Sequence, residues 1–61
     1  MDTKQIALNI FKRNRAGTGF MFTSELERKL KEELPLYDIN TDTLDLKELA
    51  RTTIVAASLG A

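Results

Sequence analysis

The chain contains no cysteine and no histidine, and this limits how a sequence of 61 residues can be stabilised. Chains this short bury only about 60% of their unfolded surface, and many of them depend on disulfides or a bound metal. The absence of thiols and imidazoles excludes disulfides, the usual zinc sites, and cysteine or histidine nucleophiles. The fold must therefore come from packing of apolar side chains, helped where necessary by association.

Three segments carry the apolar spacing of an amphipathic helix: residues 3–14, 25–34 and 46–59. In each segment, apolar or small side chains recur at intervals of three and four, so they share one face. The predicted core faces are Ile6, Ala7, Ile10 and Phe11; Leu26, Leu30 and Leu34; and Leu46, Leu49, Ala50, Thr53, Ile54 and Ala57. The sequence therefore predicts a mainly α, compact three-helix domain.

The predicted helix starts share one motif, in which Asp or Ser is followed three residues later by Gln or Glu. Such a capping box satisfies backbone amides that the first turn leaves free. The three boxes are Asp2 with Gln5, Ser24 with Glu27, and Asp45 with Glu48. Residues 16–23 and 36–43 lack helical spacing and predict two short extended connectors, the second with strand-like alternation. Pro35 is expected to end the second helix.

The composition is that of a globular segment, with 43% hydrophobic and 30% charged residues. The longest apolar run is Ile54–Ala57, and the first residues lack a basic stretch followed by an apolar one. These features predict neither a membrane span nor a signal peptide. We expect residues 1–61 to form a single small helical domain, located in the cytoplasm and without membrane contact.

Side chains suited to catalysis are scarce. Ser24 and Ser58 have no histidine to activate them. The glutamates of the second predicted helix alternate with lysines and arginines, a pattern typical of a solvated helix face. The sequence therefore predicts no catalytic residues and no cofactor, and the chain is not expected to be an enzyme.

Asp38, Asn40 and Asp42 have the one-three-five oxygen spacing that opens an EF-hand calcium loop. In that loop the sixth position needs glycine and the twelfth a bidentate glutamate. Thr43 and Leu49 occupy these two positions. We therefore predict no metal site, and expect the three side chains to serve in turns and caps.

Lys12, Arg13 and Arg15 form a basic cluster at the end of the first predicted helix. Residues 1–24 carry four basic side chains and one acidic, whereas residues 25–48 carry four basic and eight acidic. The basic end could contact phosphates of a nucleic acid. Alternatively, the cations complement the dipole at the C-terminus of a helix. Both interpretations stay open on the sequence.

The order of the helices, with a second helix that opens at residues 23–26 as Thr-Ser-Glu-Leu, resembles helix-turn-helix regulators. This resemblance implies that the third helix would contact a DNA duplex. The connector over residues 34–45 is longer than the usual turn, and the acidic Asp42, Asp45 and Glu48 would repel phosphates. A small nucleic-acid-binding regulator is therefore the alternative function.

Some apolar residues fall outside the predicted core faces. Val55 and Leu59 lie opposite the core face of the third helix, and Leu8 lies opposite that of the first. Single exposed apolar residues are common, but together they can form an interface. We predict a non-enzymatic protein-binding module or regulator, acting as a homo-oligomer or on a larger partner, with Phe20 and Phe22 as further anchors. A small structural component of a larger assembly is a third reading.

Overall fold

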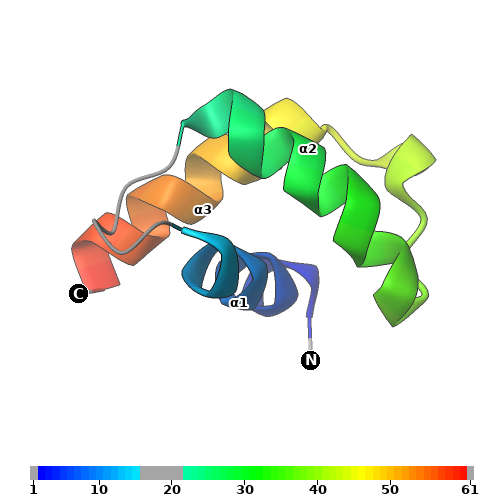
Figure 1. The fold of residues 1–61 in the computed structure, drawn as a ribbon, viewed down its shortest axis with the longest axis horizontal. Helices are drawn as coiled ribbons and strands as arrows, with labels where there is room; N and C mark the ends of the chain where they lie inside the picture. The colour runs from blue at the N-terminus through cyan, green and yellow to red at the C-terminus, as the bar shows by residue number, and fades with distance from the viewer. Residues whose placement is uncertain (1, 16–21, 61) are drawn as a thin grey trace.

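The computed structural model describes residues 2–15 and 22–60, which form three α-helices and two 3-10 turns (Figure 1). The helices are α1 (Thr3–Asn14), α2 (Thr23–Glu33) and α3 (Leu46–Gly60), and the turns are η1 (Leu34–Tyr37) and η2 (Thr41–Thr43). No strand occurs among the described residues. The predicted mainly α, three-helix architecture is confirmed. The first predicted connector, including Phe20, lies outside the described residues apart from its last two positions.

The buried core lies where the three helices meet. α1 contributes Ile6, Ala7, Ile10 and Phe11, α2 contributes Leu26 and Leu30, and these pack with Leu34 and Ala50. Around them, α3 supplies mostly half-buried side chains: Leu46, Leu49, Ile54 and Ala57. Thr53 is also buried, and its hydroxyl donates to the Leu49 carbonyl at 2.7 Å, so burial leaves no unsatisfied polar atom there. The predicted core faces are confirmed.

Two helix starts are capped by the aspartates of the predicted capping boxes, while the Gln5 side chain bonds to Asn9 and that of Glu48 to Arg51. Asp2 Oδ1 accepts a hydrogen bond from the amide of Gln5 at 2.8 Å, and Asp45 Oδ1 accepts one from the amide of Glu48 at 3.1 Å. Each bond satisfies an N–H group that has no partner within the helix. The bounds of α1 agree with the prediction, and α3 continues one residue beyond it.

The predicted capping box at the start of α2 is wrong. α2 begins at Thr23, two residues earlier than predicted, and its N-cap is Phe22, which offers no side-chain hydrogen bond to the first turn. The amides of Glu25 and Leu26 instead donate to the Phe22 carbonyl, both at 3.1 Å. Ser24 is therefore inside the first turn. The leucines of α2 are still buried as predicted, because their four-residue spacing does not depend on where the helix starts.

The second connector is helical rather than extended. Pro35 lacks the N–H group needed to continue the α-helical ladder, and the chain tightens into η1. The amide of Asp38 then donates to the Pro35 carbonyl at 3.1 Å, and that of Ile39 donates to the Leu34 carbonyl at 3.3 Å. This Schellman pairing requires a left-handed residue, and Asp38 has φ 61° and ψ 29°. It returns Ile39 to the edge of the core.

Candidate functional site

The outer face of the C-terminal half of α3 is uncharged and largely apolar. Val55 is 52% exposed and Leu59 is 83% exposed. Thr52 and Ala56 are exposed as well. These four residues follow one another at intervals of three, one and three, so they occupy one side of the helix. Because the sequence has no charged residue after Arg51, this surface, here called the α3 stripe, carries no charged side chain.

Leu8 lies beside the α3 stripe rather than alone on α1. A recess of about 200 Å³ opens between the two helices. Its lining residues are Asp2, Lys4, Gln5 and Leu8 from the α1 side, and Leu49, Thr52, Thr53 and Ala56 from α3. Leu8 is half-buried in this position. Since Thr52 and Ala56 belong both to the recess and to the stripe, Leu8 and the stripe form one surface.

The remaining predicted anchor, Phe22, is 62% exposed at the start of α2 and is not among the residues that line this recess. Two further exposed apolar residues, Leu36 at 80% and Tyr37 at 41%, lie in η1. Neither belongs to the predicted contact residues. The available signal was their position after Pro35, where the spacing of the buried leucines ends.

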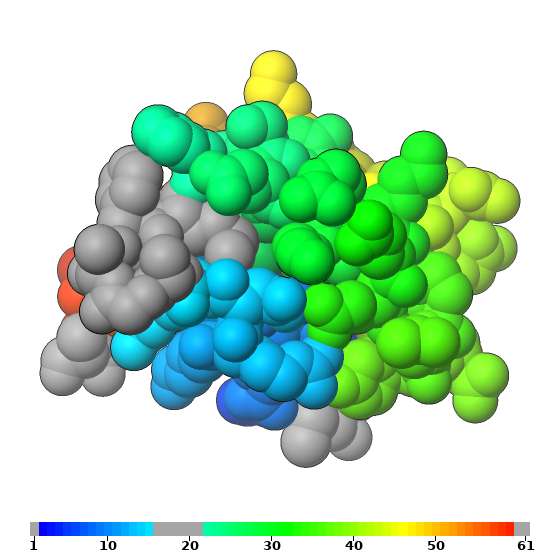
Figure 2. Space-filling model, in the orientation of Figure 1, coloured from blue at the N-terminus to red at the C-terminus, as the bar shows by residue number. Residues whose placement is uncertain are grey.

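The Arg13 side chain is paired with other residues of the same chain. Its guanidinium forms an ion pair with Glu33, and Asn14 Nδ2 donates to the other oxygen of the same carboxylate at 2.8 Å. Hydrogen bonding to Tyr37 and to Glu33 raises the pKa of Arg13 above its ordinary value. Arg13 therefore joins the end of α1 to the end of α2, and Figure 2 shows that the surfaces of these two helices adjoin.

The predicted basic cluster is consequently divided between two sides of α1. At 100° per residue, Lys12 and Arg15 fall within about 60° of each other, whereas Arg13 is turned about 100° or more away from both. The Arg15 guanidinium lies over the Phe11 ring, 5.9 Å from its centroid. Lys12 is exposed. The sequence cluster is therefore not one continuous cationic surface.

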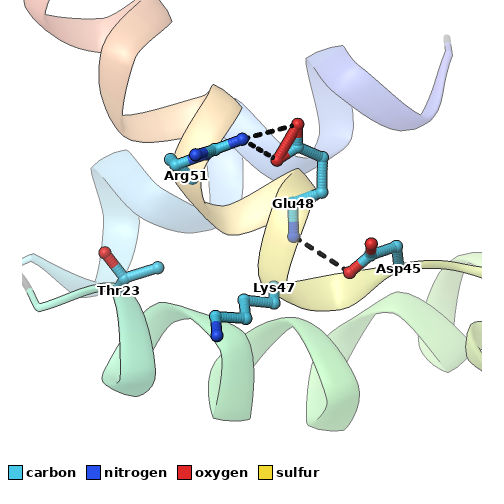
Figure 3. A pocket seen from close by; sticks show the side chains of 5 residues that line it. All are labelled: Thr23, Asp45, Lys47, Glu48 and Arg51. Atoms are coloured by element: carbon cyan, nitrogen blue, oxygen red, sulfur yellow. Dashed lines mark hydrogen bonds and ion pairs between the residues drawn. The ribbon is translucent and has the colours of Figure 1, made fainter.

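A recess of about 380 Å³ opens between the first turns of α2 and α3 (Figure 3). Glu48 and Arg51 point to each other there, with a hydrogen bond of 2.9 Å, and Asp45 is turned to the Glu48 amide that it caps. Lys47 extends toward α2, where Thr23 also lines the recess. Both carboxylates therefore have partners within the chain.

The polar residues of the second connector take part in turns. Asn40 Oδ1 accepts from the amide of Asp42 at 2.9 Å at the start of η2, and the Thr43 hydroxyl donates to the Asn40 carbonyl at 3.1 Å. The predicted turn role is thus confirmed for Asn40. Over residues 2–15 and 22–60, no group of three acidic, His or Cys side chains is arranged to hold a metal ion.

Within the same ranges, no helix has both the length and the apolar character needed to cross a bilayer. Comparisons of the chain with protein-family models, with curated proteins and with solved structures gave no match. The features that can indicate a function are therefore those of the surface itself: the α3 stripe, the adjoining recess and the charges around them.

Proposed function

We propose that this chain is a non-enzymatic protein-binding module whose contact surface is the α3 stripe together with Leu8. One observation carries the proposal: Val55 and Leu59 stand exposed on an uncharged helix face that continues into a recess. Full burial of a valine or leucine side chain contributes roughly 1.5–3 kcal/mol. Two such residues beside a cavity provide the apolar centre around which protein interfaces form.

The rest of the described surface supports binding rather than catalysis. The ion pairs Arg13 with Glu33, Arg28 with Glu32 and Arg51 with Glu48 occupy carboxylates that would otherwise be available. The chain has neither histidine nor cysteine for acid-base or nucleophilic chemistry. A module of this kind would change the activity of its partner by covering part of the partner's surface. We therefore assign it a regulatory role.

The proposal is tested by selecting displayed helical peptides on the immobilised protein and then competing them with soluble variants. We expect the double variant Val55→Asp, Leu59→Asp to compete poorly, because two carboxylates would be buried in the contact. Leu36→Asp is the control, since Leu36 is 80% exposed, close to the 83% of Leu59, but lies in η1. It should compete as well as the unmodified chain. Equal competition by the double variant, with its helical circular dichroism intact, would place binding elsewhere and refute the proposal.

Binding of a nucleic acid is the second candidate, supported by the exposure of Lys12 and Arg15. Arg13, which the same candidate needs, is held against Glu33. Phosphate-driven binding falls steeply as salt rises, whereas an apolar contact responds little. Titration of the chain with a short DNA duplex at low and at moderate salt separates the two: salt-sensitive binding lost in Lys12→Ala, Arg15→Ala would favour the nucleic acid.

A further inference from the structure

We infer that the partner segment is an acidic amphipathic helix that lies along the groove between α1 and α3, by which we mean the recess lined by Lys4 and Leu8 and the surface of both helices that continues from it. This inference rests on the proposed function, because it uses the α3 stripe as one wall of the groove. The new element is the positive charge of the other wall, which α1 forms. Lys4 lines the recess directly, and the side of α1 on which it lies continues with further cations.

The groove side of α1 is a row of three cations around one leucine. Lys4, Leu8, Lys12 and Arg15 fall within about 80° of the helix circumference at 100° per residue. All three cationic side chains are exposed, and Leu8 is half-buried. Asp2 also lines the recess, but its carboxylate is turned to the Gln5 amide that it caps.

Within residues 2–15 and 22–60, no acidic side chain neutralises these cations. Among the described residues, the ion pairs involve Arg13, Arg28 and Arg51, and neither Lys4 nor Lys12 forms one. Arg15 has the Phe11 ring as its neighbour. α1 and α3 pack together and run in the same general direction (Figure 1). The groove therefore has a cationic rim on α1 and an uncharged, apolar rim on α3.

A complementary ligand must present an apolar row flanked on one side by carboxylates, which is the pattern of an acidic amphipathic helix. Lys4 and Arg15 are eleven residues apart, or about 16 Å along the helix axis. A partner helix of about three turns would match this length. Charge complementarity of this kind guides encounter and fixes the orientation of the bound segment.

A second copy of the chain does not offer this pattern. Its acidic helix, α2, buries its apolar row, because Leu26, Leu30 and Leu34 are fully buried in the core. The exposed side of α2 thus carries carboxylates without apolar neighbours to fill the recess. α3 has the converse composition, with exposed apolar residues and no acid beyond Glu48. The apolar and acidic residues that do adjoin, Leu36 and Tyr37 next to Asp38, lie in or directly after η1, whose four residues are too short for a partner segment of three turns.

The test uses three synthetic helical peptides that share one leucine row and differ only in the flanking residues, which are Glu, Gln or Lys. Binding to the intact chain is followed by fluorescence anisotropy. We expect the Glu peptide to bind about tenfold or more tightly than the Lys peptide, since several exposed ion pairs act together. The charge reversal Lys4→Glu, Lys12→Glu should invert this order. The matched control Lys31→Glu, Lys47→Glu makes the same change in net charge at exposed positions outside the groove and should not invert it.

The two proposals fail in different ways in this experiment. If all three peptides bind equally and Val55→Asp, Leu59→Asp abolishes binding, the charge inference is wrong and the proposed function stands. If peptides bind and that double variant has no effect, both are wrong. Absence of binding by the Glu peptide overturns the inference. Tighter binding to phosphatidylserine vesicles than to the Glu peptide, through the same cations, would also overturn it in favour of a lipid surface.

Discussion

Asp2, Ser24 and Asp45 stand in the same sequence motif, yet only the two aspartates act as caps. Asp2 and Asp45 each accept an amide hydrogen three residues later. Ser24 lies within the first turn of α2, which starts from the Phe22 carbonyl. Ser and Glu are common on exposed helix positions as well as at caps, so their spacing alone does not locate a helix start. In α2 the start is marked by the Phe22 carbonyl, which accepts from the amides of Glu25 and Leu26.

This difference gives a prediction for three single substitutions. Asp2→Ala and Asp45→Ala should each lower the free energy of unfolding by about 1 kcal/mol, because each removes an acceptor for a first-turn amide. Ser24→Ala, the matched control, should change it by no more than a few tenths of a kcal/mol. Urea unfolding followed by circular dichroism measures all three. A larger loss for Ser24→Ala than for either aspartate would contradict the observed start of α2.

The leucine row of α2 contributes much of the buried core. Leu30 is fully buried, and its replacement by alanine should cost about 2–5 kcal/mol. A domain of this size has only about 3–9 kcal/mol of total stability. Leu30→Ala is therefore expected to lose a large part of the total stability and to unfold at a much lower urea concentration. Leu36→Ala removes the same atoms from an 80% exposed side chain and should leave the unfolding midpoint nearly unchanged; equal losses for both would contradict the assigned core.

The sequence predicts the three helices more accurately than it predicts the segment that joins α2 to α3. Apolar spacing of three and four residues specifies α1 and the core face of α3, because burial of that face stabilises each helix. The alternation of Tyr37 and Ile39 with Asp38 and Asn40 instead predicted a strand-like connector. A strand needs a pairing partner, whereas the turns η1 and η2 satisfy their backbone groups locally. Alternation over four residues could not distinguish these two outcomes.

Asp38 provides a test of this turn. Its φ of 61° lies in the left-handed region, which glycine adopts without the steric cost that a Cβ atom imposes. Asp38→Gly should therefore raise the free energy of unfolding by up to about 1 kcal/mol, and Asp38→Val should lower it by about 1–2 kcal/mol. Asp42→Gly is the control, because Asp42 has no positive φ and glycine can only add flexibility there. Stabilisation by Asp42→Gly but not by Asp38→Gly would exclude the Schellman turn.

At the scale of the whole molecule, the sequence predicts the exposure of Val55 and Leu59 but not how α1 adjoins them. Helical periodicity on α3 is sufficient to place Val55 and Leu59 away from the core, and both are exposed. It does not show that Leu8 adjoins them through Ala56, because that requires the packing of α1 on α3. The pairing of Arg13 with Glu33 likewise joins residues twenty positions apart. A pattern over a few neighbouring residues cannot predict a contact between residues so far apart in the sequence.

The size and charge of this surface also predict the oligomeric state. Stable interfaces bury roughly 1,200–2,000 Å² in total, and a symmetric contact made only by the α3 stripe involves two large apolar side chains per copy, Val55 and Leu59. We therefore expect a monomer in sedimentation velocity experiments from micromolar to near-millimolar concentration, at low and at moderate salt. A dimer that persists in salt and is lost in Val55→Asp, Leu59→Asp would show that the proposed contact surface binds a second copy of the chain. A dimer that survives this double variant would place self-association on another face, where Leu36 and Phe22 are the exposed apolar residues to substitute next.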